Sequence, residues 1–215
     1  EGVFAEEKRV STRLFVLAVA QDGAEVQTGY SAPGKSVGLE LFDLYPPKAV
    51  GEKAARQALT NLKARPAPAG TFPVVVGPGF GGVLFHEAVG HLLETTSVAR
   101  KASVLADKLG EVVASPAVTY IDDGTLPHAW GSTEMDDEGR PTERTVLIEK
   151  GVLKSYMVDR LGHLLTGYPM TGSGRRQDYT FAPTSRMRNT FLAPGEARVE
   201  DLFAGIAFGL YAKEM

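Results

Sequence analysis

Cysteine is absent from the 215 residues of this sequence, and its absence narrows the chemistry that they can perform. Without a thiol, the printed residues form no disulfide, contain no thiolate metal ligand and have no cysteine nucleophile. The sequence also lacks the run of about 18 apolar residues that a membrane span requires, and it shows no signal peptide. We therefore expect a cytoplasmic protein that has no membrane partner.

A strong net charge is also absent. The formal net charge is -3, and Lys and Arg are scattered along the chain, so we expect no nucleic-acid partner. The hydrophobic content of 43% is ordinary for a globular protein, and the length is sufficient to bury a sizeable core. Because the chain opens with EGVF and has no initial Met, we expect a fragment of a longer protein.

The first third of the chain has the pattern of a hairpin followed by a helix. Strand-like runs at residues 10–20 and 24–31 flank a turn that contains Gly23, which predicts an antiparallel hairpin. Residues 48–63 have apolar side chains at helical spacing, which predicts an amphipathic helix packed on that hairpin. A connector rich in proline and alanine, residues 64–70, then suggests a domain boundary.

We place this boundary between residues 66 and 67. The predicted fold class is α+β: residues 1–66 are the C-terminal part of an N-terminal α/β domain, and residues 67–215 are a larger, mostly β domain. In the second domain we predict a buried strand at 72–76, helices at 83–94, 97–109, 158–165 and 199–210, strands at 112–121, 145–148 and 152–157, and a long loop at 166–184.

A glycine cluster follows the first predicted strand of the second domain. Gly77, Gly79 and Gly82 spell G-x-G-x-x-G between a strand and a helix, as in dinucleotide-binding folds. Pro78, however, removes one of the backbone amides that would face a pyrophosphate. A nucleotide-binding oxidoreductase is therefore one interpretation of residues 77–82. The other is a turn that lets the strand and the helix pack closely.

His86, Glu87 and His91 lie together in the apolar segment that comes next. They have the composition of the H-E-x-x-H zinc motif with one additional residue. On a regular α-helix, positions five apart differ in direction by roughly 140°, whereas positions four apart differ by about 40°. A regular helix would thus point the two imidazoles apart. We predict instead a widened, π-type turn across residues 87–91, which the backbone freedom of Gly90 would allow.

These three side chains have a defined chemistry if they bind metal. Two imidazoles and a third ligand hold Zn²⁺ with one position open for water, and the ion lowers the pKa of that water. Glu87 would accept the water's proton and pass it to the departing amine of a peptide bond. In the competing interpretation, His86 is a core histidine, and Glu87 and His91 lie on a solvated face. Spacing alone does not separate these two interpretations.

Two further pairs of charged residues are candidates for substrate binding. Asp122 and Asp123 precede a glycine, where they either bind substrate or form a local turn. Arg175 and Arg176 lie in a glycine-rich loop, where they either hold a peptide carboxylate or a partner subunit, or remain solvated.

Five further segments of the sequence are distinctive when they are read together. In chain order they are GGVLFHEAVGHLLE (81–94), VTYIDDGTLP (118–127), DDEGRPT (136–142), TGSGRRQDY (171–179) and RMRNT (186–190). Together these segments resemble the TldD/PmbA family of metalloproteases. The resemblance is dense from about residue 74 to residue 210 and loose before it. The chain looks like the TldD-type subunit, because the paired TldE/PmbA-type subunit lacks the H-E-x-x-x-H residues.

This resemblance implies a cytoplasmic zinc metalloprotease. The enzyme would work with a TldE/PmbA-type partner subunit or as a homo-oligomer, and its substrates would be unfolded, extended or leader-type peptides. In the family's pattern His86 and His91 are zinc ligands, and Glu87 is the catalytic base.

The chain departs from the family's pattern in two places. The family's third zinc ligand is a cysteine towards the C-terminus, so we expect an incomplete site here, with weak or no zinc binding and little activity. Thr95 and Thr96 stand where the family usually has Gly-Asp, which would remove an acid that orients a ligand. A non-catalytic subunit that only assembles is therefore an alternative function.

Overall fold

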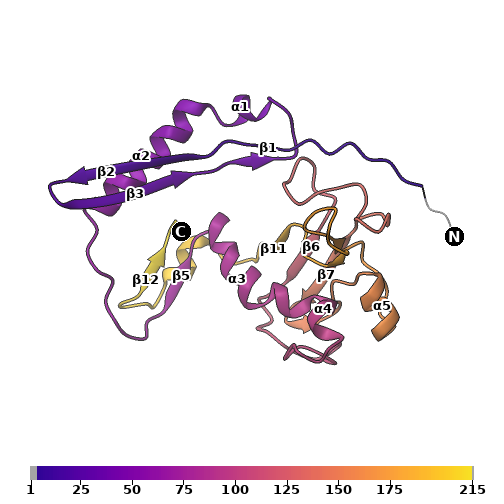
Figure 1. Ribbon diagram of the computed structural model, residues 1–215. Coiled ribbons are helices and arrows are strands. Elements are labelled where there is room, and N and C mark those ends of the chain that lie inside the picture. The colour runs from indigo at the N-terminus through magenta and orange to yellow at the C-terminus, as the bar shows by residue number, and fades with distance from the viewer. Residues whose placement is uncertain (1–3, 215) are drawn as a thin grey trace. The chain divides into compact units, whose positions relative to one another are not determined.

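The computed structural model describes residues 4–214, and these residues form two compact units (Figure 1). We refer to residues 8–70 with 128–130 as the hairpin unit, and to residues 4–7, 71–127 and 131–214 as the site unit. Both units contain helices and strands, so the predicted α+β class is confirmed. The domain boundary between residues 66 and 67 stays a prediction.

The hairpin unit contains the predicted hairpin and helix. β2 (Val16–Asp22) pairs antiparallel with β3 (Glu25–Ser31), and the turn contains Gly23 with a left-handed φ of 57°. α2 (Pro47–Leu62) has proline at its first position, where no intrahelical hydrogen bond is lost. Both predictions are confirmed. The smaller elements of the unit are β1 (Thr12–Arg13), β4 (Gly34–Lys35), which pairs with β1, and α1 (Leu41–Leu44).

α2 lies so close to the hairpin that one strand position requires glycine. The helix buries Val50, Ala54 and Ala58 against the hairpin. The side chains of the two alanines are single methyl groups. A Cβ on Gly29 of β3 would lie 2.3 Å from the carbonyl oxygen of Ala54 and 2.4 Å from the backbone nitrogen of Ala58. The packing therefore depends on the missing side chain at position 29.

The site unit is built on an antiparallel sheet of four strands in the order β11-β6-β7-β8. These strands are β6 (Tyr120–Asp123), β7 (Arg144–Glu149), β8 (Val152–Leu153) and β11 (Thr190–Leu192). β7 and β8 form the predicted hairpin, and its turn residues Lys150 and Gly151 have positive φ angles of 46° and 84°. The buried core beside the sheet contains Leu93, Val98, Tyr120, Leu147, Ile148, Leu153, Tyr156, Met157, Val158 and Met187.

Shorter elements surround this core. α5 (Arg160–Thr166) confirms the predicted helix after β8, and the Asp159 carboxylate caps it by accepting a hydrogen bond from the Gly162 backbone. Within the predicted loop 166–184, β9 (Gly174–Arg175) pairs with β10 (Thr184–Ser185).

The predicted helix at residues 97–109 is wrong. α4 (Thr95–Val98) is a single turn, and Lys101 and Asp107 then adopt left-handed φ angles of 57° and 61°. The Ser103 hydroxyl donates to the Leu92 carbonyl and accepts from the Leu105 backbone. Such hydrogen bonds compete with helical ones, so this segment folds as successive turns.

The predicted strand at residues 112–121 is also largely wrong. β6 begins at Tyr120 and continues through Asp123, while Val112 makes an isolated bridge to Val152. Between them Pro116 has no N–H group to donate to a sheet. Asp122 and Asp123, expected in a turn, are therefore strand residues.

The predicted helix at residues 199–210 divides into two different elements. A 3₁₀ turn, η3 (Val199–Phe203), is followed by Gly205 with a φ of 77° and then by β12 (Leu210–Ala212). β12 pairs in parallel with β5 (Val74–Val76), the strand expected to be buried. That expectation is wrong as well, because Val74 is 52% exposed.

Among residues 4–214, we find no helix with the length and apolar character needed to cross a bilayer.

Candidate metal centre

The candidate ligands come from two short helices that meet at a break. His86 and Glu87 lie in the last turn of α3 (Gly82–Ala88), which follows a 3₁₀ turn, η1 (Gly79–Gly81). Val89 leaves the helical conformation, with φ -130° and ψ -44°, and η2 (Gly90–Leu93) continues as a 3₁₀ helix that carries His91. The predicted local distortion is present, but its predicted π-type geometry is wrong. The helix stops and restarts.

Gly90 has a different role from the one expected. Its φ is not in the left-handed region, so its conformation does not require glycine. A Cβ at Gly90 would lie 2.2 Å from the sulfur of Met187 and 3.2 Å from the hydroxyl oxygen of Tyr120. The Tyr120 hydroxyl donates to the Phe85 carbonyl in the turn before the break, at 3.4 Å. Gly90 thus allows the break to pack against the sheet and its core.

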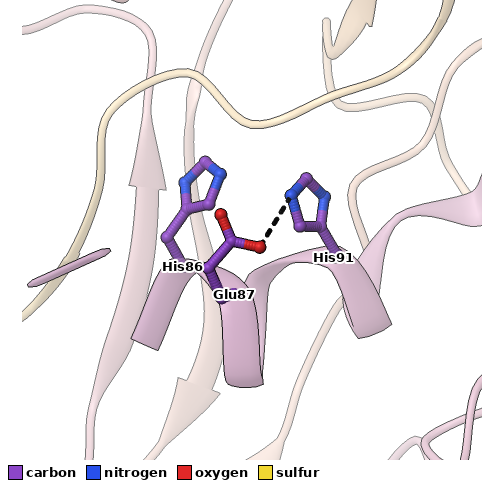
Figure 2. Close-up of side chains that lie close together, drawn as sticks. All are labelled: His86, Glu87 and His91. Atoms are coloured by element: carbon purple, nitrogen blue, oxygen red, sulfur yellow. Dashed lines mark ion pairs between the residues drawn. The ribbon is translucent and has the colours of Figure 1, made fainter. Parts of the chain in front are cut away.

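The break brings the two histidines together. Their ring centroids are 4.8 Å apart, and the ring planes are nearly perpendicular, at 85°. Figure 2 shows the Glu87 carboxylate between the rings. Its Oε2 atom lies 3.8 Å from Nε2 of His91. One ligand atom from each of the three residues lies within 4.8 Å of the others. A regular helix would point the imidazoles of His86 and His91 apart. The helix break instead places them where both can bind one metal ion.

The environment of His86 favours its neutral form. Burial lowers the pKa of the imidazole, and the neighbouring His91 and the positive charge of Arg175 lower it further, against the raising effect of Glu87 and Glu94. A neutral imidazole has the free lone pair that a metal ion requires.

A buried carboxylate contacts the second histidine. Oε1 of Glu94 lies 3.2 Å from Nδ1 of His91, and Oε2 of Glu94 accepts a hydrogen bond from Arg186 at 2.9 Å. The neighbouring threonines point elsewhere: Thr95 donates to the Asp159 carboxylate at 2.9 Å, and the Thr96 hydroxyl lies 2.6 Å from that of Thr184. His91 therefore has an acid beside it even though threonines occupy positions 95 and 96.

The two candidate arginines have different surroundings. Arg175 is an exposed residue of β9 whose side chain donates to the Met187 carbonyl, and its charge acts on both His86 and Asp122. Arg176 is exposed, and its backbone N–H donates to the Asp137 carboxylate. Of the two, Arg175 is the one whose charge acts on His86.

The two candidate aspartates are buried and have partners within the chain. The Asp122 carboxylate accepts a hydrogen bond from the Arg188 backbone at 2.7 Å. The Asp123 carboxylate accepts from both the backbone N–H and the hydroxyl of Thr125, at 2.8 and 2.7 Å. These contacts stabilise the end of β6 and leave little of either carboxylate accessible to a substrate.

Asp122 is expected to make the stability of the protein depend on pH. Burial raises the pKa of Asp122 to about 7, although the Arg188 hydrogen bond and the charges of Arg188 and Arg175 oppose this. An unfolded aspartate titrates near pH 3.9, so the folded state binds the additional proton between about pH 4 and 7. The free energy of unfolding should therefore fall as pH rises through this window, by up to roughly 4 kcal/mol, and level off above it.

Asp122→Asn tests this expectation. The amide stays uncharged and keeps an oxygen for the Arg188 backbone, so the decline between pH 4 and 7 should shrink by the contribution of this one group. Urea unfolding of both proteins at several pH values measures the difference. Parallel pH profiles would show that Asp122 does not cause the decline.

Of the three glycines in the cluster, Gly77 is the one that is closely packed. A Cβ on Gly77 would lie 2.6 Å from the Lys213 carbonyl oxygen, and the Gly77 N–H donates to the Ala212 carbonyl at 2.7 Å. Gly79 has a φ of 83°, as a turn before a helix requires. These contacts give both glycines a structural role in holding β5 against β12 and in starting α3.

Sequence reasoning missed Glu94 and Arg186 as residues of the site. Both lay within the segments that carried the family resemblance, and Glu94 follows His91 by three positions, a spacing at which helical side chains meet. Arg186 is far from Glu94 in the sequence and meets it only after the chain has folded, so local spacing does not reveal this contact.

Comparison with known sequences identifies relatives of this chain. The sequence profile for the PmbA/TldA metallopeptidase C-terminal domain matches residues 69–215, and that for the central domain matches residues 1–62. The metalloprotease TldD homolog of Haemophilus influenzae is 40% identical, over 99% of this chain and 45% of the relative. The zinc metalloprotease TldD homolog of Saccharolobus solfataricus is 31% identical, over 94% of this chain and 45% of the relative. The chain thus spans about half the length of the curated relatives it matches.

Solved structures have the same fold. A Thermotoga maritima protein solved as a candidate modulator of a DNA gyrase aligns with a TM-score of 0.75 and 28% identity, over 92% of this chain and 44% of that one. TldE from Thermococcus kodakarensis aligns with a TM-score of 0.74 over 93% of this chain and 45% of that one. Its identity of 24% supports a common fold and nothing finer.

Proposed function

Because this chain belongs to the PmbA/TldA metallopeptidase family, we propose that it carries the histidine part of the zinc site of a peptide hydrolase. His86 and His91 are zinc ligands in this proposal, and Glu87 is the catalytic base. The observation that carries it is the convergence of these three side chains across the helix break. The names of the relatives, metalloprotease and zinc metalloprotease, agree with it.

The donor set suits zinc. Imidazole nitrogens are ordinary ligands of catalytic zinc, and the lowered pKa of His86 favours the neutral form of one imidazole. Bound zinc supplies a Lewis acid that polarises a carbonyl and lowers the pKa of water. Catalytic zinc usually has three protein ligands, and this sequence has no cysteine to serve as the family's third. We therefore expect the chain alone to bind zinc weakly.

Glu87 is suited to moving the proton. Its side chain is 66% exposed, so a substrate can approach it, and its carboxylate lies between the two imidazoles (Figure 2). A carboxylate in this position accepts a proton from the attacking water and delivers it to the leaving amine. The water oxygen bonds to the carbonyl carbon and the C–N bond breaks, so the two proton transfers accompany the release of a carboxyl group and a free amine.

The proposed substrates are unfolded, extended or leader-type peptides. Arg175 is the residue that we propose to bind a carboxylate or carbonyl of the peptide, because it is exposed and its charge acts on His86. Arg176 beside it is a second candidate. Asp122 and Asp123 are weaker candidates, since both are buried.

We also propose that the working protein is a cytoplasmic assembly with a TldE/PmbA-type partner or with a second copy of this chain. A solved protein named TldE has the fold of this chain, and a partner of that kind is the first arrangement. Most soluble oligomers consist of copies of one chain, which is the second arrangement. Sedimentation analysis of the protein, alone and mixed with such a partner, measures which assembly forms.

His91→Ala tests the metal site. Losing one of two imidazole ligands should weaken zinc binding by about 100-fold or more, because a single imidazole holds the ion poorly. His128→Ala is the matched control, since His128 is exposed and lies outside the cluster. Competition with a chromophoric chelator measures the affinity of both variants and of the wild type.

The possible outcomes separate the alternatives. If His128→Ala retains zinc and His91→Ala loses it, the cluster is the binding site. If the wild type binds no zinc even with its partner subunit present, the subunit that only assembles becomes the better interpretation. If the two variants lose zinc equally, the ion binds elsewhere.

A further inference from the structure

Glu94 is one of the most buried charged residues of the site unit, and both of its oxygens have cationic or polar neighbours. The residue is 2% exposed. One oxygen accepts a hydrogen bond from Arg186 at 2.9 Å, and the other lies 3.2 Å from Nδ1 of His91. Removing a carboxylate from water is costly unless such partners compensate for it. The protein thus maintains a buried acid directly beside a proposed ligand.

This contact determines which nitrogen of His91 carries the proton. An ionised carboxylate only accepts hydrogen bonds, so Nδ1 must be the donor in this pair. In a neutral imidazole the other nitrogen, Nε2, then has a free lone pair. Nε2 is also the atom on the side of Glu87, 3.8 Å from its Oε2 atom. The lone pair therefore lies on the side of the cluster where the proposed metal binds.

We propose that Glu94, held in place by Arg186, is a positioning residue that keeps His91 in the Nδ1–H tautomer and presents Nε2 to the metal. The inference rests on the proposed zinc site, because the choice of tautomer has a purpose only if Nε2 is a ligand. Carboxylates that accept the second N–H of a ligating histidine occur widely in metal sites and commonly change metal affinity by about 10- to 100-fold.

Glu94→Gln gives a specific expectation. Arg186 can only donate, so the amide oxygen stays with Arg186 and the amide NH₂ group faces His91. Nδ1 then has to accept, and the proton moves to Nε2. We expect the His91 tautomer to switch from Nδ1–H to Nε2–H in the metal-free protein, and the zinc affinity to fall by about 10- to 100-fold. Long-range ¹H–¹⁵N correlation spectra at alkaline pH measure the tautomer without metal or activity.

A second substitution in the same protein should reverse the effect. With Arg186→Met added to Glu94→Gln, the amide oxygen is free to turn towards His91 and accept from Nδ1. The Nδ1–H tautomer and most of the zinc affinity should return. A role confined to fold stability predicts the opposite, because the double variant has lost both partners of the ion pair.

Asp159→Asn is the matched control. Asp159 is a carboxylate of similar burial, 3% exposed, whose partners are the Thr95 hydroxyl and the Gly162 backbone. This variant should lose stability without changing the tautomer of His91.

The long-range ¹H–¹⁵N spectrum of the wild type tests the inference by itself, without any variant that has to fold. An Nε2–H tautomer there overturns the inference, as does an unchanged tautomer in Glu94→Gln or the same switch in Asp159→Asn. The zinc titration is separate: an assembled wild-type protein with the expected tautomer that binds no zinc refutes the proposed function but supports the assignment of Glu94 as the acceptor.

Discussion

In the assembled, zinc-loaded protein, Glu87→Gln is expected to lower peptide cleavage by about 100- to 10,000-fold while the zinc content stays unchanged. The amide keeps the size and shape of the carboxylate but cannot accept a proton from water. Both imidazoles remain, with ring centroids 4.8 Å apart, so the proposed metal ligands are preserved. The measurements are kcat/KM on an unfolded peptide and the zinc content of the same sample.

A surface carboxylate provides the control for this prediction. Glu111 is 57% exposed in its side chain, close to the 66% of Glu87, and pairs with Lys108. Glu111→Gln should leave cleavage and zinc content as in the wild type. If Glu87→Gln loses zinc together with cleavage, Glu87 is a ligand and not a base, and if it cleaves normally, the base is another group.

Gly29→Ala is expected to destabilise the hairpin unit by about 3 kcal/mol, the upper part of the usual range for an overpacked position. The new methyl group would lie 2.3 Å from the Ala54 carbonyl oxygen and 2.4 Å from the Ala58 nitrogen. Both are backbone atoms, so no side chain can rotate away, and α2 has to separate from β3. Hydrogen–deuterium exchange of the β2 and β3 amides measures this loss within the hairpin unit.

Gly51→Ala is the matched substitution on the helix itself. A Cβ at Gly51 meets no atom within 4 Å. Alanine at a helix interior is favoured over glycine by up to about 1 kcal/mol, so exchange should slow slightly in this variant. If both variants behave alike, the proximity of α2 and β3 at Gly29 does not control stability.

The candidate site could be proposed from the sequence because its residues are neighbours in the chain. One short segment contains His86, Glu87, His91 and the glycines that precede them. Its residue types alone suggested a metal site. The type of distortion was not predictable, since both a π-type turn and a helix break bring the imidazoles together. Packing of Gly90 against Met187 and Tyr120, from distant parts of the chain, accompanies the break.

Elements that depend on distant partners were predicted less well. The two hairpins were evident because each turn has glycine and each strand pairs with its sequence neighbour. Residues 199–210 have an apolar pattern that suits a helix, but Leu210–Ala212 pair with β5 instead. Likewise, Arg186 lies far from Glu94 in the sequence and meets it only in the folded chain.

The β5–β12 pair also affects the order in which the protein folds. Val74 pairs with Leu210, so this parallel contact closes a loop that contains nearly the whole site unit. Contacts between residues far apart in sequence carry a larger entropic cost and form slowly. β5 leads directly into the glycine turn and α3, whose last turn carries His86 and Glu87. We therefore expect the strand that precedes the candidate catalytic helix to gain its partner late in folding, after the local hairpins have formed.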